Sequence, residues 1–240
     1  MTRLLISEIT HMGAGFCVIG LERQGETFRS IRPLPPRGTS WLPFPHKRGE
    51  IIEFQLQTTV VARPHIEDRK SSGDLGTRAG VSETELVSYL RRAEVADDLQ
   101  HLFGCSMRPS AQGGNAVWAD PSEAHRSICG LSFDKLRFRL FPESVRAALS
   151  CASGESLRSL PLVDRDWREF LRQATGRLSG ANRGQRLEKF LNGPLLDRMQ
   201  ESPDRFARIG ITRADENGCC WLMLDSLFPG PKKEWLEELQ

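Results

Sequence analysis

Hydrophobic and polar residues alternate over short runs in the first part of the chain, which is typical of β-strands. Residues 3–9 and 15–22 are apolar runs separated by a glycine-containing turn, so they predict a hairpin. Residues 27–33 alternate and end at Pro33, and residues 50–64 predict one long strand or two short ones. The N-terminal region is therefore expected to hold four or five strands before any helix.

The first helical pattern follows these strands. Ser82 and Glu85 have the spacing of a capping box, and leucines at helical spacing extend the pattern over residues 82–104. Residues 105–125 show no periodicity and contain two adjacent glycines and two prolines, so they predict a linker.

Short strand patterns resume after this linker and alternate with helical segments. Asp164 predicts the N-cap of a helix, and the sequence DENG at 215–218 predicts the turn of a closing hairpin. The expected strands are residues 127–133, 135–142, 156–162, 205–214 and 218–228, and the expected helices are residues 165–178, 183–193 and a short C-terminal segment.

Two sets of short antiparallel strands with added helices predict a mainly β protein of the α+β class. They argue against a doubly wound fold, in which strands and helices alternate one for one. Each half has the length and strand number of a five-stranded barrel of the oligonucleotide-binding (OB) type. We expect two small OB-like antiparallel β-barrels: residues 1–104 with the following helix, a linker at 105–125, and residues 126–240 with inserted helices. A single larger β-sandwich is the alternative.

Composition narrows the class of protein. The 240 residues are 39% hydrophobic and 27% charged, as in an ordinary globular protein. The net charge is only +2, so any anion-binding surface must come from local clustering. Six cysteines without a CxxC pair predict reduced thiols in a cytoplasmic protein and no structural zinc. No apolar run approaches the roughly 18 residues of a membrane span, so no membrane partner is expected.

Residues 30–49, here called the opening loop, combine five prolines, four cations and two large aromatic residues without a carboxylate. Cations neutralise phosphates and aromatic faces stack on bases, so this loop predicts a nucleic-acid-binding site. In the alternative interpretations Trp41 and Phe44 anchor the loop in the barrel, or the loop binds a protein partner. The candidate residues are Arg32, Arg37, Trp41, Phe44, Lys47 and Arg48.

Residues 167–190 form a second basic cluster, with six cations against two carboxylates. Arg168 and Arg172 lie four residues apart on one helical face, and the sequence SGANRG at 179–184 suits phosphate contacts. A charged outer helix face is the alternative. The candidate residues are Arg168, Arg172, Arg177, Arg183 and Arg186.

His65, Glu67 and Asp68 stand together in the sequence RPHIEDRK and could form an acid–base centre or a metal site. Ion pairing with the flanking cations explains them without chemistry. The chain has no phosphate-binding loop, hydrolase elbow, zinc-protease motif or dinucleotide fingerprint. We therefore expect no enzyme, no cofactor and no metal, and an enzyme built on these three residues is the weaker alternative.

Several segments resemble the bacterial dual-OB-containing domain family. The segments RLLISEIT, GFCVIGLE and FRSIRP are similar to the opening of that family, and RPHIEDR is similar to its P-H-x-x-E segment. In the C-terminal half, LPLVDRDWREFLR and the hairpin RIGITRA…CCWLMLDSLFP resemble its later elements. The resemblance implies two OB-type barrels and a role in recognising nucleotides or nucleic acid, often in bacterial conflict systems. It implies no catalytic residues.

Together these features predict a nucleic-acid-binding accessory protein for single strands or duplex ends. It would act in a bacterial antiviral defence or nucleic-acid-processing system, with a protein partner in a larger complex. The rival hypothesis is a scaffold subunit that holds a nuclease or helicase partner without binding nucleic acid itself. The fold alone does not decide between them.

Overall fold

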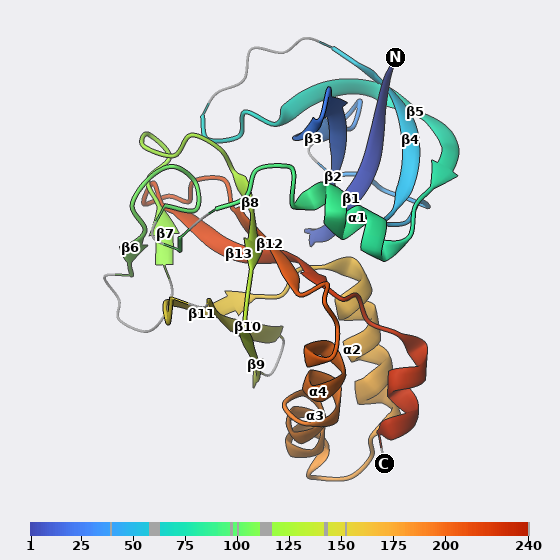
Figure 1. The fold of residues 1–240 in the computed structure, drawn as a ribbon, viewed down its shortest axis with the longest axis vertical. Coiled ribbons are helices and arrows are strands. Elements are labelled where there is room, and N and C mark those ends of the chain that lie inside the picture. Colours follow the sequence, from blue (N-terminus) through green and yellow to red (C-terminus); the bar gives the residue numbers. More distant parts are fainter. Residues whose placement is uncertain are drawn as a thin grey trace.

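The computed structural model describes residues 1–38, 40–57, 63–96, 98–99, 101–110, 117–141, 144–151 and 153–239. Strands form the upper and left parts of the molecule in Figure 1, and helices form most of its lower part. The expectation of a mainly β protein with added helices is confirmed.

Five strands make up the N-terminal half. They are β1 (Thr2–Met12), β2 (Gly15–Gln24), β3 (Thr27–Leu34), β4 (Glu50–Leu56) and β5 (Asp68–Gly80). They hydrogen-bond in the order β1-β2-β3-β5-β4, and β4 pairs back onto β1, so the sheet closes into a barrel. β3 and β5 run parallel, and the other neighbours run antiparallel. The barrel interior is filled by Leu4, Ile6, Ile9, Val18, Ile31, Trp41, Phe44, Ile52 and Phe54.

Helix α1 (Glu83–Leu90) begins at the expected capping box. The Ser82 hydroxyl accepts a hydrogen bond from the Glu85 backbone N–H, and the Glu85 carboxylate accepts one from the Ser82 N–H. The helix ends at Leu90, so the expected helix over residues 82–104 was wrong beyond its first two turns.

After α1 the chain passes between the two halves of the molecule and pairs with both. The backbone N–H of Phe28 donates to the carbonyl of Arg92, and Val95 forms a bridge with Gly130 in the C-terminal half. These bonds use backbone groups that a longer helix would have paired internally. Tertiary pairing has therefore overridden the local helical pattern.

The C-terminal half contains two sheets. Its strands are β6 (Arg108–Pro109), β7 (Val117–Ala119), β8 (Ile128–Ser132), β9 (Lys135–Phe141), β10 (Ser144–Ser150), β11 (Ser156–Pro161), β12 (Phe206–Ile211) and β13 (Cys220–Phe228). β9, β10 and β11 form an antiparallel three-stranded sheet, and the other strands pair in the order β6-β7-β13-β12-β8. A parallel bridge between Leu162 and Leu224 joins the end of β11 to β13.

Some of these strands were not predicted from the sequence. β5 and β10 fall in segments without a clear alternation, and β6 and β7 fall within the expected linker, where they extend the edge of β13. Residues 58–62 of the expected strand over 50–64 lie outside the described residues, and the described strand there is β4.

Three helices connect β11 to β12: α2 (Arg165–Arg177), α3 (Arg183–Leu191) and α4 (Pro194–Gln200). The first two were expected, and a 3-10 helix, η1 (Lys233–Glu238), follows β13. As predicted, Asp164 caps α2, and its carboxylate accepts from the backbone N–H groups of Asp166 and Trp167. Trp167 is fully buried and donates its indole N–H to the carbonyl of Leu227 at 2.9 Å, which fixes α2 against β13.

The two halves meet through buried ion pairs and apolar contacts. Arg208 of β12 and Glu8 of β1 are both fully buried and hydrogen-bond at 2.5 Å. Arg48, in the loop before β4, pairs with Asp164 at 3.0 Å. A mixed apolar cluster from both halves lies beside them, formed by Leu5, Leu21, Leu86, Val87, Leu90, Phe206 and Phe228.

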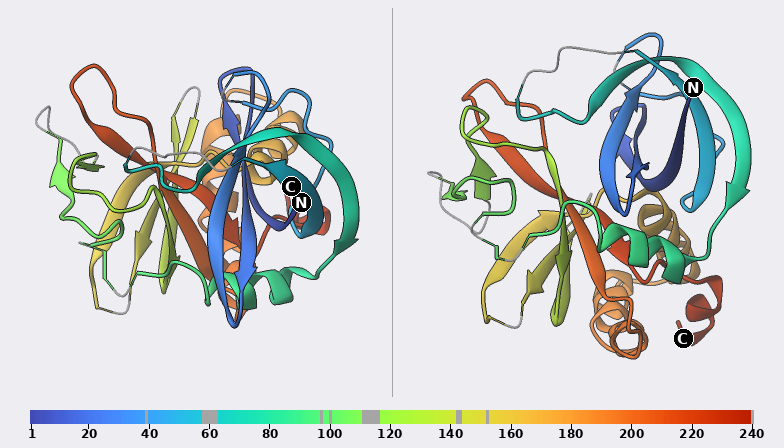
Figure 2. Two further views of the ribbon diagram at one scale, coloured as in Figure 1. Left: turned by 90° about the horizontal axis from the view of Figure 1, so that it is seen from above. Right: turned by 45° about the horizontal axis from the view of Figure 1, so that its top comes forward.

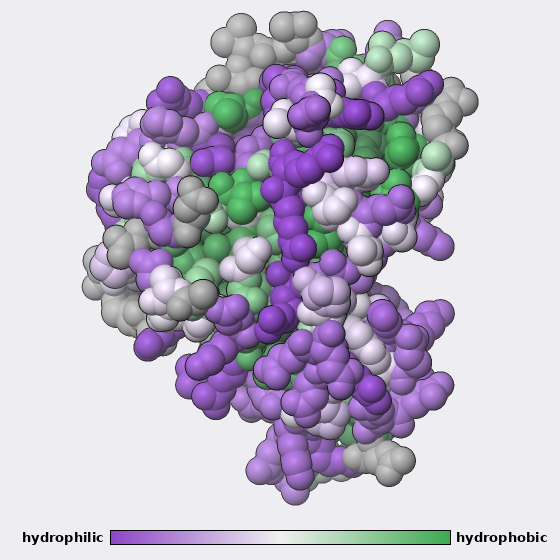
Figure 3. Space-filling model, viewed as in Figure 1, coloured by the Kyte–Doolittle hydropathy of each residue, from purple (hydrophilic) through white to green (hydrophobic). Residues whose placement is uncertain are grey.

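Figure 2 shows β12 and β13 passing alongside the N-terminal barrel in both views. In Figure 3 hydrophilic residues cover the helical part at the bottom, and hydrophobic residues are most visible in the middle of this face, around β8, β12 and β13. None of the described helices is long and apolar enough to cross a membrane. All six cysteines are free thiols.

Candidate functional site

The aromatic residues of the opening loop lie in the barrel core. Trp41 is 7% exposed and Phe44 is 3% exposed, and their ring centroids are 5.7 Å apart. The Trp41 backbone exchanges two hydrogen bonds with Phe16, and its indole N–H donates to the Pro33 carbonyl at 2.8 Å. This is the anchoring arrangement, and neither ring is free to stack on a base in this structure.

Two of the four opening-loop cations are buried in ion pairs. Arg32 donates to Asp68, and the Arg48 guanidinium contacts both Asp164 and the ring of Phe228, whose centroid is 4.5 Å away. Burial raises the pKa of Asp164, and Arg48 opposes that rise. Arg37 and Lys47 are exposed, so they alone of the predicted opening-loop residues face solvent.

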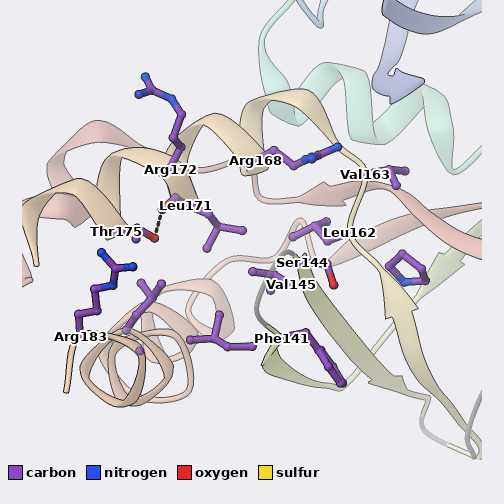
Figure 4. A pocket seen from close by; sticks show the side chains of 14 residues that line it. Phe141, Ser144, Val145, Leu162, Val163, Arg168, Leu171, Arg172, Thr175 and Arg183 are labelled. Carbon is purple, nitrogen blue, oxygen red and sulfur yellow. Dashed lines mark hydrogen bonds between the residues drawn. The ribbon is translucent and has the colours of Figure 1, made fainter. Parts of the chain in front are cut away.

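The second basic cluster forms part of a groove between α2, α3 and the ends of β9–β11, with a volume of about 650 Å³. Arg168, Arg172 and Arg183 lie along its rim, as Figure 4 shows, and its floor is apolar, with Leu162 and Val145. The structure therefore brings together three of the five arginines predicted here.

These rim arginines differ in their pairing. Arg172 is held by Glu169 through two hydrogen bonds of 2.8 and 2.6 Å, which lower the pKa of Glu169 to about 2. Arg168 and Arg183 are exposed and form no ion pair with a described residue.

The other two predicted arginines lie away from the groove. Arg177 donates to the backbone carbonyl of Leu236 at 2.8 Å and so holds η1 against α2. Arg186 is exposed on α3 and does not line the groove.

A basic surface that was not predicted lies on the outer side of the three-stranded sheet. Alternate residues of β9, β10 and β11 point away from the core, and this outward set forms what we call the basic sheet face: Lys135, Arg137, Arg139, Arg146 and Arg158. Arg139 lies directly opposite Arg146 in the β9–β10 register. None of the five forms an ion pair with any residue in the described part of the chain.

The basic sheet face is hollowed. Its outward positions on the same strands include Ala148, Ser150 and Ser156, whose small side chains leave a depression of about 480 Å³ among the arginines. No carboxylate of the described residues lines this depression. The surface therefore combines a hollow with positive charge from three strands.

An exposed aromatic ring stands at one end of this face. Phe141 is 43% exposed, and the Arg146 guanidinium lies 5.2 Å from its ring centroid. Arg146 also donates to the Ser159 hydroxyl and carbonyl, while its buried Nε has no hydrogen-bond partner among the described residues. Phe141 also lines the groove beside α2, so it connects the two basic surfaces.

The three residues of the weaker enzyme hypothesis lie where the halves meet. Glu67 accepts from the backbone N–H and hydroxyl of Ser127, and burial raises its pKa. Asp68 accepts from Arg32 and Arg213. Burial, followed by the charge of Arg32, lowers the pKa of His65 to about 4. Glu67 and Asp68 thus have structural partners, whereas both ring nitrogens of His65 are buried without a hydrogen-bond partner among the described residues. The described residues contain no cluster of metal-ligating side chains.

Comparisons with protein-family models, curated proteins and solved structures found no match. The arguments about function therefore rest on the geometry of this chain. The sequence signal for the basic sheet face was the alternation KLRFRLF at 135–141, whose arginines at every second position share one face once a strand is assumed.

Proposed function

We propose that the protein binds nucleic acid through the basic sheet face. The observation that carries the proposal is the gathering of five cations on one face of a three-stranded sheet without ion-pair partners among the described residues. Like charges placed directly opposite each other destabilise neighbouring strands, as at Arg139 and Arg146. A polyanion relieves that repulsion and gains free energy by releasing its counterions.

The hollow and the aromatic ring favour a strand with accessible bases. Small side chains at Ala148 and Ser150 allow close approach to the sheet, while the surrounding arginines can contact phosphates. Phe141 offers an exposed ring on which a base can stack, an interaction worth about 1–3 kcal/mol. Single strands and duplex ends present such bases, so we propose these as ligands.

We also propose that both halves are OB-like barrels. The N-terminal strands follow the order β1-β2-β3-β5-β4, with a parallel pair between the third and fifth strands. If β8 and β9 are counted as one bent strand, the C-terminal order is the same: β8/β9, β10, β11, β13, β12. There the parallel contact between third and fifth strands is the Leu162–Leu224 bridge. OB-folds bind oligonucleotides on the face of the second and third strands, which corresponds here to β10 and β11.

Two OB-like barrels agree with the resemblance to the bacterial dual-OB-containing domain family. On that basis we propose an accessory role in a bacterial defence or nucleic-acid-processing system, in the cytoplasm and within a larger complex. The rival scaffold role predicts that the isolated protein has little affinity for nucleic acid.

Fluorescence anisotropy of the isolated protein with labelled single-stranded and duplex DNA and RNA, at two salt concentrations, tests the proposal. The variant Arg137→Gln/Arg139→Gln removes two exposed cations from the basic sheet face. We expect its affinity for single strands to fall at least tenfold at low salt. The log–log salt slope should decrease by about 0.7 for each phosphate that the variant no longer neutralises.

The matched control is Arg23→Gln/Arg29→Gln, which makes the same change in net charge at exposed positions of β2 and β3 in the N-terminal barrel. Its affinity should match that of the unmodified protein. Equal losses of affinity in both variants would mean that only net charge matters, which contradicts a defined face. No binding of any nucleic acid at low salt would refute the function and favour the scaffold role.

A further inference from the structure

A cavity of about 400 Å³ lies between the two halves, away from the basic sheet face. Its walls come from β1, β2 and β3 on one side and from β12, β13 and the segments beside them on the other. Met12, Ile19, Ile211 and Met223 supply apolar surface to these walls. A volume of this size suits a small organic ligand and lies within the range of ordinary binding pockets, about 300–1,000 Å³.

Two buried polar atoms of residues that line this cavity lack hydrogen-bond partners among the described residues. Asp225 is only 5% exposed, and its Oδ1 has no hydrogen-bond partner among the described residues. Arg32 gives its Nε to Asp68, but its buried Nη2 is likewise unpaired among those residues. A buried polar atom without a partner costs about 1–3 kcal/mol, so both atoms favour a ligand that satisfies them.

The backbone leaves room for the Asp225 carboxyl. A side-chain Cβ at Gly210, on the neighbouring strand β12, would overlap with Asp225 Oδ2. Glycine at this position therefore permits the carboxyl to occupy this place on the cavity wall.

The charges of the cavity favour a ligand with one anionic end. Arg32 and Arg213 both line the cavity and share Asp68 as their ion-pair partner, and Glu67 also acts on Arg32, but neither of these carboxylates lines the cavity. Arg213 lines the cavity and its side chain is 56% exposed, so the cavity meets solvent beside an arginine.

The Asp225 carboxyl, on β13, favours a different group from the anion that the two arginines favour. Burial and the nearby Glu8 raise its pKa to about 8, so at neutral pH it is a protonated carboxyl that donates one hydrogen bond and accepts another. The edge of a nucleobase offers the complement, with an N–H donor beside an acceptor atom. An apolar ligand would leave both polar groups unsatisfied, and free phosphate would leave the apolar walls empty.

We propose that this cavity binds a nucleoside monophosphate, with the base edge on Asp225 and the phosphate toward Arg32 and Arg213. This proposal stands on residues other than those of the basic sheet face. The two sites can therefore be tested separately.

Isothermal titration calorimetry with the four common nucleoside monophosphates, their nucleosides and inorganic phosphate tests the inference on the full chain. We expect at least one monophosphate to bind one-to-one with submillimolar affinity, its nucleoside to bind more weakly, and phosphate alone not to bind. Asp225→Ala should weaken binding of that monophosphate at least tenfold. Asp225→Asn should stay within about threefold, because the amide also offers one donor and one acceptor.

Arg213→Gln tests the anionic end with a half-exposed residue. It should weaken binding of the monophosphate at least threefold and leave that of the nucleoside unchanged, while Arg23→Gln changes neither. Oligonucleotide binding by Asp225→Ala should equal that of the unmodified protein, so failure at one site is distinguishable from failure at the other. Absence of binding by every monophosphate at about 1 mM, a Kd that corresponds to about −4 kcal/mol, would overturn the inference. Equal affinity of Asp225→Ala and the unmodified protein would also overturn it.

Discussion

Strands β1–β3 of the N-terminal barrel and strands β9–β11 of the three-stranded sheet both run antiparallel to their neighbours in these sets, but their outer faces have opposite surroundings. On the first, Glu8 and Arg32 face the other half of the molecule and are paired with Arg208 and Asp68. On the second, four cations of the basic sheet face are exposed and Arg146 is half-buried, and none of the five has an ion-pair partner among the described residues.

The difference shows how burial changes the role of charged side chains. A buried charge is tolerated only with a partner, so each charge on the first face requires a specific residue, Arg208 of the other half for Glu8 and Asp68 of the same barrel for Arg32. An exposed charge needs no partner for folding, so unpaired cations gathered on the second face are available to a ligand. The same contrast holds for the aromatics, since Trp41 lies in the N-terminal core and Phe141 is half exposed.

The largest expected effect comes from breaking the buried face. Arg208→Ala leaves Glu8 buried without its counter-charge, so we expect the free energy of unfolding to fall by about 3–5 kcal/mol. Urea denaturation followed by tryptophan fluorescence measures this change. Arg139→Ala on the basic sheet face should change the free energy of unfolding by no more than about 0.5 kcal/mol. Similar values for the two variants would contradict the comparison.

The aromatic residues extend the same test. Trp41→Ala should lower the free energy of unfolding by about 3–5 kcal/mol, because it opens a cavity in the barrel core, and the remaining folded protein should keep its nucleic-acid affinity. Phe141→Ala should have little effect on unfolding but weaken single-strand binding by about 1–3 kcal/mol without changing the salt slope. If Trp41→Ala weakened nucleic-acid binding and Phe141→Ala did not, the opening loop would be the binding site.

The sequence allowed prediction of the elements whose signals are local. The hairpin of β1 and β2, the capping box at Ser82 and the cap of α2 at Asp164 each depend on a few neighbouring residues. By contrast, β5 is polar and glycine-containing, and it is a strand because β3 and β4 pair with its two edges. No local pattern reports such pairing.

The residues of the candidate site also divide into those with a local sequence signal and those that only tertiary pairing brings together. The groove arginines Arg168 and Arg172 were found because helical spacing places them on one face. The basic sheet face was missed because Arg146 joins Arg139 only through the register of β10, a strand that the pattern did not reveal. The anchoring role of Trp41 depends on a pairing with Phe16, which lies 25 residues earlier in the sequence.

The pH dependence of stability tests the buried region of the molecule through Asp225, a buried carboxyl in the cavity between the two halves. Its pKa is raised from the usual 3.8 to about 8, so between these values the folded protein holds a proton that the unfolded chain has lost. Stability therefore falls as the pH rises through this window. His65 acts in the opposite direction, because its pKa is lowered from 6.5 to about 4, but most of its contribution falls below pH 6.5. The charged groups that act on Asp225 are Glu8, Arg32, Arg208 and Asp164.

From pH 6.5 to 8.0 we expect the free energy of unfolding to decrease by about 1–2 kcal/mol. In Asp225→Asn the decrease should be smaller by most of that amount, because the amide does not titrate. Urea denaturation at the two pH values measures both. An unchanged slope in Asp225→Asn would show that another buried carboxyl, such as Glu8 or Asp164, titrates in its place.

The smallest expected effect concerns the groove beside the basic sheet face, where Glu169 pairs with Arg172. Glu169→Gln frees this arginine for a phosphate, so nucleic-acid affinity should rise by roughly 1.5- to 5-fold at low salt, a small effect because the ion pair is exposed. The salt slope should steepen by about 0.7 if one more phosphate is neutralised. Glu188→Gln on α3 makes the same charge change outside the groove and serves as the control in the same anisotropy assay. A rise in affinity confined to Glu169→Gln would mean that the nucleic-acid interface extends from β9–β11 onto α2. Equal rises in both variants would reflect net charge alone, and the interface would then be limited to the basic sheet face.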